Sequence, residues 1–219
     1  MKTKKHNRRT FVKSSLLTTA AIGTFAVSSS AQQAVKTDPE PTPLSELNLV
    51  GPKEGYTPHM GALVSMLNWM RDVVLGSVRN LSTEQLDYLH DDDSNSIGAM
   101  LLHLGATERF YQLNTFEGRR WGNWPSEDRK LWSVAMSLGG AGRREIKGQP
   151  IDYYIERLSK VREHTLAELK KRDDAWLMEI DPKWGWGSST NNYCKWFHVC
   201  EHESNHNGQI KYIRSRISV

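Results

Sequence analysis

Residues 198–209 read HVCEHESNHNGQ, and this stretch near the C-terminus decides how the rest of the chain is interpreted. It contains His198, His202 and His206 at a constant spacing of four. On an α-helix this spacing stacks the three side chains on one face, one turn above the next. Histidine is the commonest metal ligand, and two histidines at positions i and i+4 can hold one ion. The stretch therefore predicts a helix that carries a metal site.

The charge of the chain falls into two parts. The formal net charge is +4, but six of the 29 Lys and Arg residues lie in the first 31 positions, which contain no Asp or Glu. The remainder carries 23 basic against 25 acidic residues. This part lacks the basic excess of nucleic-acid-binding proteins, so we expect no nucleic-acid partner.

The first 31 residues are typical of an export signal, with a basic start, an apolar run over residues 16–27 and small residues after it. The apolar run is too short to span a bilayer. Residues 7–13, NRRTFVK, resemble the twin-arginine signal. We expect a periplasmic or extracellular protein that has no stable membrane insertion once the signal, residues 1–31, is removed. Residues 32–57 are rich in Pro, Thr, Glu and Gly and are predicted to form a flexible tether.

Four long helical patterns follow the tether. Apolar residues recur at spacings of three and four in residues 58–80 and 151–172. Residues 91–116 begin with a polar turn rich in capping residues, and residues 190–217 begin with two further capping candidates. No strand pattern is convincing. The sequence therefore predicts an all-α fold, a four-helix bundle over residues 58–219.

Two connections between these helices carry their own signals. Ser82 and Gln85 match a capping box, which predicts a short helix after the first long one. Residues 117–149 hold three tryptophans among several glycines and are predicted to be a long irregular connection between helices two and three, with one helical stretch near residues 129–138. Either this connection is functional or its tryptophans seal one end of the core.

A family resemblance emerges when the helix-two pattern and the C-terminal pattern are taken together. The stretch SIG at residues 96–98 leads to His103, and residues 206–210 read HNGQI. This combination resembles the DinB-like superfamily, which includes the DinB and YfiT-type proteins. The resemblance covers residues 58–219. Its members are four-helix bundles that bind a divalent metal through one histidine on helix two and two on the last helix. Asn207 replaces the usual arginine and Asn205 precedes His206, and neither change removes a ligand.

The resemblance implies that His103, His202 and His206 hold one divalent metal ion. Three neutral imidazoles and a water make an open site of the kind used by catalytic zinc. Nitrogen ligands suit zinc or nickel, with iron, cobalt and manganese as further candidates, so the sequence leaves the metal open. His198 is an alternative ligand, a support for a ligand, or part of a pocket wall.

Tryptophans are candidates for the wall of a substrate pocket beside the predicted metal site, namely Trp184, Trp186 and the tryptophans of residues 121–132. Trp184 and Trp186 lie in the stretch that breaks the chain before the last helix. Apolar walls around a few polar groups are typical of small-molecule sites. We therefore predict that these tryptophans line a pocket beside the metal.

The stretch HESNH at residues 202–206 also matches the H-E-x-x-H helix of zinc peptidases, in which the glutamate is the general base. Residues 207–219 contain no His, Asp or Glu to supply the usual third ligand. No strand is available to hold a peptide either, so a zinc peptidase is the weaker alternative. Glu203 remains a candidate catalytic residue that orients or deprotonates a metal-bound water.

The resemblance implies a metal-dependent enzyme that acts on a small molecule. DinB-like relatives include transferases and isomerases that use thiols such as mycothiol or bacillithiol, and a metal makes a bound thiol or water nucleophilic by lowering its pKa. Such thiols are mainly cytosolic, whereas the leader predicts export, so a hydrolase stands beside a thiol-dependent transferase. A non-catalytic metal-binding bundle for stress or sequestration is the alternative. Relatives often dimerise, which implies a homodimer.

Overall fold

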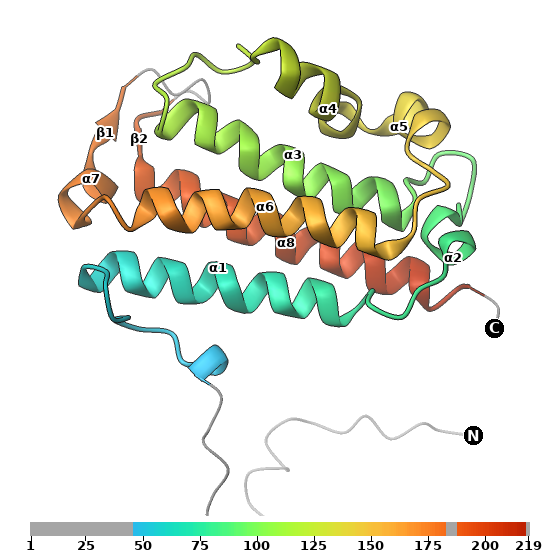
Figure 1. Ribbon diagram of the computed structural model, residues 1–219, viewed down its shortest axis with the longest axis horizontal. Helices are drawn as coiled ribbons and strands as arrows, with labels where there is room; N and C mark the ends of the chain where they lie inside the picture. The colour runs from blue at the N-terminus through green and yellow to red at the C-terminus, as the bar shows by residue number, and fades with distance from the viewer. Residues whose placement is uncertain (1–45, 183–187, 218–219) are drawn as a thin grey trace, which may run out of the picture. The chain divides into compact units, whose positions relative to one another are not determined.

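Four long helices form the bundle in the described part of the protein. The computed structural model describes residues 46–182 and 188–217, so the leader, Trp184 and Trp186 lie outside the described part. The long helices are α1 (Pro58–Gly76), α3 (Ile97–Thr115), α6 (Ile151–Leu169) and α8 (Asn192–Arg214), and they run side by side (Figure 1). The predicted all-α four-helix bundle is confirmed. None of the described helices is long and apolar enough to cross a membrane.

Seven shorter elements complete the fold. They are η1 (Glu46–Asn48), α2 (Thr83–Asp87), α4 (Ser126–Ser137), α5 (Gly139–Glu145), α7 (Asp174–Met178), β1 (Ile180–Asp181) and β2 (Thr190–Asn191). The two strands pair antiparallel, with Asp181 opposite Thr190. The expectation that the chain contains no strand was wrong for this ladder, because two residues per strand are too few to show an alternating pattern.

Side-chain caps fix where three of the helices begin. The Ser82 hydroxyl accepts a hydrogen bond from the Gln85 backbone N–H, and the Gln85 side chain accepts one from the Ser82 N–H, as the capping box predicts. Ser96 caps α3, and Asn191 caps α8 by accepting a hydrogen bond of 2.8 Å from the Cys194 N–H. These caps satisfy backbone donors that have no partner within the helix.

The connection between α3 and α6 is more regular than predicted. It contains two helices, α4 and α5, and Figure 1 shows them lying along α3 on the side away from α1. Trp132 of α4 is buried, and its ring carbons lie 3.0 Å from the place where a Cβ on Gly105 would stand. Gly105 therefore lets α4 pack closely onto α3. The helical stretch predicted near residues 129–138 is confirmed as α4, whereas α5 was missed because Gly139, Gly140 and Gly142, which lie inside it, were taken for loop signals.

The end of the predicted tether packs against α1. The Gly51 N–H donates a hydrogen bond of 3.3 Å to the Ser65 hydroxyl, and Tyr56 packs against a buried apolar cluster. A Cβ on Gly61 would stand only 2.4 Å from the Lys53 backbone nitrogen, so the close packing of this segment on α1 requires glycine at position 61. Residues 46–57 are thus ordered against the bundle.

Candidate metal centre

Three histidines from two helices converge inside the bundle. His103 projects from α3, and His202 and His206 project from successive turns of α8. One ring nitrogen from each histidine lies within 4.8 Å of the other two. The Nε2 atoms of His103 and His202 are 2.9 Å apart. The structure therefore brings together the three residues that the sequence singled out.

Hydrogen bonds fix the orientation of two of the three rings. His103 Nδ1 lies 2.9 Å from the Ala135 carbonyl oxygen of α4, and a carbonyl can only accept, so Nδ1 carries the hydrogen. His206 Nδ1 lies 3.2 Å from Gln209 Oε1. The Gln209 amide nitrogen donates to Asn205 Oδ1 at 2.9 Å, which turns its oxygen toward His206. Both rings therefore present Nε2 lone pairs, and such partners characterise metal-binding histidines.

The electrostatic environment keeps the three imidazoles neutral. Burial lowers the pKa of His103, although its hydrogen bond to Ala135 acts in the opposite direction. Burial and the neighbouring histidines lower the pKa of His202 to about 3. Burial and His103 lower the pKa of His206 to about 4, against a smaller opposing effect of Gln209. At neutral pH each ring is in the unprotonated form that a metal requires.

These pKa shifts predict acid sensitivity of the metal-free protein. A histidine whose folded pKa lies below its unfolded value of about 6.5 takes up a proton on unfolding. Its stabilising contribution is therefore complete above pH 6.5 and is lost as the pH falls toward 4. We expect Tm of the metal-free protein to fall between pH 7 and pH 5, and to fall less in a His202→Gln variant. Equal pH dependence in both proteins would contradict this.

The donor set fits a divalent ion that accepts nitrogen ligands. Zinc–nitrogen bonds of about 2.0–2.1 Å place neighbouring ligand atoms roughly 3.3 Å apart in tetrahedral geometry. The 2.9 Å separation of the two Nε2 atoms lies slightly below this value. No carboxylate of the described residues belongs to the group. An all-imidazole set suits zinc, nickel, copper and iron rather than magnesium or calcium.

His198 lies one turn before His202 on α8 and is not a member of the group. Its ring centroid is 5.6 Å from that of His202, and its Nδ1 is 3.0 Å from the Tyr111 hydroxyl. Its Nε2 lies 3.9 Å from a Glu201 carboxylate oxygen. Of the three roles considered for His198, this arrangement favours support of the neighbouring ligand through packing.

Glu203 points away from the histidine group into a buried ion cluster. Its Oε1 accepts hydrogen bonds from Arg71 at 2.5 Å and from Arg162 at 2.8 Å. Its Oε2 is buried and accepts none from the described residues. The carboxylate is held by two arginines and faces away from the three histidines, so this placement does not favour Glu203 as a general base or the H-E-x-x-H peptidase interpretation.

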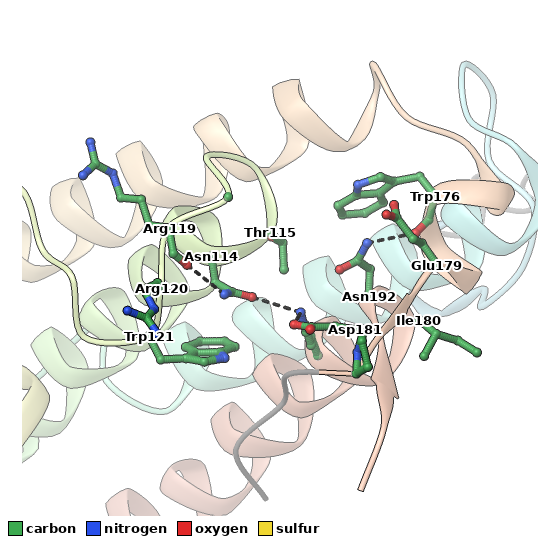
Figure 2. A pocket seen from close by; sticks show the side chains of 13 residues that line it. Asn114, Thr115, Arg119, Arg120, Trp121, Trp176, Glu179, Ile180, Asp181 and Asn192 are labelled. Carbon is green, nitrogen blue, oxygen red and sulfur yellow. Dashed lines mark hydrogen bonds and ion pairs between the residues drawn. The ribbon is translucent and has the colours of Figure 1, made fainter.

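A series of polar pairs between α3 and α8 continues from the histidine group toward one end of the bundle. Thr107 Oγ1 lies 3.4 Å from His202 Nε2, and the Tyr111–His198 pair follows one turn later. The series ends at Lys195, whose buried ammonium donates to Asn114 Oδ1 at 3.0 Å. Both residues of this last pair line a cavity of about 910 Å³, in which Figure 2 labels Asn114.

Two cavities flank the histidine group along α8. The first is also lined by Trp121 and Trp176 (Figure 2). The ion pair of Lys195 and Asp181 lies in its wall. The second, of about 770 Å³, is lined by the last half of α8, including the His206 partner Gln209, and by residues 90–95. None of the three histidines lines either cavity. The predicted pocket residues Trp184 and Trp186 lie outside the described residues.

The comparisons with known proteins agree with this geometry. The family model of the mycothiol-S-transferases matches residues 62–218. The chain belongs to this family. The mycothiol-S-transferases are part of the DinB-like superfamily, so the resemblance drawn from the sequence is confirmed.

A solved structure shows the same fold. The crystal structure of a conserved protein from Enterococcus faecalis matches with a TM-score of 0.53 and 12% sequence identity, over 69% of this chain and 92% of that one. At this identity the likeness concerns the fold alone. No curated protein matches the chain.

Several buried residues around the site in this mycothiol-S-transferase family member left no signal in the sequence. The Ala135 carbonyl reaches His103 from α4, and a backbone group leaves no pattern of its own. Arg71, Glu108 and Arg162 are charged residues on helices and resemble solvent-facing positions until their partners are known. Gln209 lies inside the HNGQI motif, which is the signal that could have identified it.

Proposed function

We propose that this protein is a metal-dependent thiol transferase that activates a low-molecular-weight thiol at the His103, His202 and His206 group. The convergence of three neutral imidazoles within 4.8 Å of one another carries the proposal. Membership of the mycothiol-S-transferase family supports thiol chemistry in particular. An all-nitrogen site with an open position suits binding of one further ligand, here a thiol sulfur.

Divalent metal bound by these histidines lowers the pKa of a thiol ligand, so that a thiolate is available near neutral pH. The protein's own part is to hold the ligands. Ala135 and Gln209 fix the rings of His103 and His206 with Nε2 directed inward, and burial keeps both rings unprotonated. In the transfer itself a sulfur–carbon bond forms, the bond from that carbon to the leaving group breaks, and the thiol proton passes to solvent.

The two cavities support a reaction with two substrates. A transferase must hold a thiol and an acceptor at once, and one cavity lies toward each side of the histidine group along α8. Volumes of about 910 and 770 Å³ fall within the range of small-molecule sites. We assign the bodies of the two substrates to these cavities and the reacting atoms to the space beside the histidines.

A metal-dependent hydrolase is the second candidate, and the leader favours it. Residues 1–31 carry a twin-arginine-like pattern, and we propose that the protein works in the periplasm or outside the cell. Water is always available there, whereas thiols of low molecular weight are mainly cytosolic. The same three-imidazole site that activates a thiol can activate water.

One assay distinguishes the two candidates. Metal-loaded protein is incubated with monochlorobimane and, in turn, mycothiol, bacillithiol and glutathione, and the thioether is measured by fluorescence. We expect thioether formation to accelerate with one of these thiols and the acceleration to disappear on chelation. Acceleration with none of the thiols, together with metal-dependent hydrolysis of p-nitrophenyl esters, would reject the transferase in favour of the hydrolase.

A further inference from the structure

Each of the four long helices contributes one charged side chain to a buried cluster at the centre of the bundle. The members of this four-helix ion cluster are Arg71 on α1, Glu108 on α3, Arg162 on α6 and Glu203 on α8. Each is at most 6% exposed. The two arginines and two glutamates balance in charge, so the cluster forms without a net buried charge.

Both arginines reach both glutamates. Arg162 holds Glu108 through two parallel contacts of 2.8 and 3.1 Å and reaches Glu203 at 2.8 Å. Arg71 reaches Glu108 at 2.7 Å and Glu203 at 2.5 Å. Thr165 adds a hydrogen bond to Glu108 at 2.6 Å. Planar guanidinium groups make such contacts directional, so the carboxylates are held in position as well as neutralised.

The arginines are themselves anchored to backbone on opposite helices. Arg71 of α1 donates to the Leu158 carbonyl of α6 at 2.9 Å, and Arg162 of α6 donates to the Leu67 carbonyl of α1. The contacts are reciprocal and tie α1 and α6 together. Helices α1 and α6, which carry no predicted metal ligand, thus hold each other in place, and their arginines bind one carboxylate from α3 and one from α8.

Both gripped carboxylates lie next to the metal centre in sequence. Glu203 directly follows His202 on α8, and Glu108 directly follows Thr107, whose hydroxyl contacts His202. Consecutive residues of an α-helix are separated by about 100° around the axis. Holding Glu203 against the arginines therefore sets the direction in which His202 and His206 project.

The direction in which His202 and His206 project is important because a metal site tolerates only small displacements of its ligand atoms. Side-chain ends lie roughly 5–6 Å from a helix axis, so a rotation of about 10° displaces them by about 1 Å. Metal–ligand distances are held within about 0.2 Å. A small rotation of α8 about its own axis would therefore take His202 and His206 out of coordination with His103 on α3.

We propose that the four-helix ion cluster is a positioning device that fixes the rotation of α3 and α8 and thereby the geometry of the three histidines. This inference rests on the metal site under the proposed function. A contribution to stability alone does not account for the cluster, because buried ion pairs replaced together by apolar side chains of similar volume commonly leave stability unchanged or raise it. Arg71, Glu108, Arg162 and Glu203 are positioning residues in this sense.

The test replaces the whole cluster with apolar residues of similar size, as Arg71→Met, Glu108→Leu, Arg162→Met and Glu203→Leu together. Co²⁺ affinity and the visible absorption spectrum of the Co²⁺ protein, which reports coordination geometry, are compared with the unmodified protein. We expect a folded variant whose Co²⁺ affinity is lower by about 10–100-fold and whose spectrum is altered, as for loss of groups that orient metal ligands. A folded variant with unchanged affinity and spectrum would overturn the proposal.

A single substitution covers the case in which the fourfold variant does not fold. Glu203→Gln keeps the shape of the side chain and is measured below its unfolding temperature. The control is Leu177→Ala, which opens a cavity at a buried residue of α7 that is not a member of the cluster. Co²⁺ binding should weaken and its spectrum change in Glu203→Gln alone. Equal Co²⁺ binding in these two variants and the unmodified protein would reject the positioning role. Failure of the unmodified protein to bind Co²⁺ would instead reject the proposed metal site.

Discussion

Replacing His206 by alanine is expected to remove the bound metal from the purified protein. His206 supplies one of three converging nitrogens, and two imidazoles without a carboxylate among the described residues make a poor site for a divalent ion. The substitution also leaves Gln209 without its ring partner but disturbs no large part of the core. Metal content per chain, measured by plasma mass spectrometry after dialysis, should fall to the background level.

The matched control is His164→Ala. His164 is an exposed residue of α6 and belongs to no group of metal-ligand type among the described residues. This variant should retain the metal content of the unmodified protein. Wild-type metal content in His206→Ala would show that the ion is held elsewhere, and equal losses in both variants would point to nonspecific binding.

The largest expected loss of stability follows from Glu108→Gln. Burial alone would raise the pKa of Glu108, but the attraction of Arg162 and Arg71 and hydrogen bonds from Arg162 and Thr165 lower it to about 2. Removing its charge leaves two buried guanidinium groups partly unpaired. Breaking a buried pair in this way costs about 3–5 kcal/mol. In a domain of this size the corresponding fall in Tm is about 6–20 °C.

Glu156→Gln is the control for this prediction. Glu156 pairs with Lys160 one turn away on α6, and both side chains are mostly exposed. Exposed pairs contribute little, so thermal unfolding followed by circular dichroism should show no measurable change. A Glu108→Gln protein as stable as Glu156→Gln would mean that the arginines find other partners or water, and that the cluster is less tightly closed than its distances indicate.

The bundle was predictable because local signals and the overall fold agree. Apolar residues at helical spacing in α1 and α6, the Ser82 capping box and the cap before α8 each act through nearby residues. The histidine group was predictable for a related reason. His202 and His206 share a helix face by their spacing alone, and the family motif supplied His103 as their partner.

The missed features depend on partners that are distant in the sequence. A buried arginine on a helix has the same local pattern as an exposed one, so Arg71 and Arg162 became recognisable only when Glu108, 37 and 54 positions away, was placed beside them. Helix α5 was obscured by the glycines within it, whereas α4 matches the helical stretch predicted near residues 129–138. Glu203 was read within its motif as a catalytic group, whereas burial against two arginines determines its surroundings.

The hydrogen bond between His103 and the Ala135 carbonyl would couple α4 to a metal ion held by His103. A hydrogen bond that favours the ligand form of His103 is itself favoured when His103 is bound, and such coupling is reciprocal by thermodynamic necessity. A metal ion bound by His103 would therefore reduce the local opening of α4, and detachment of α4 would weaken metal binding. Packing of α4 against α3 and metal binding at the three histidines would therefore stabilise each other.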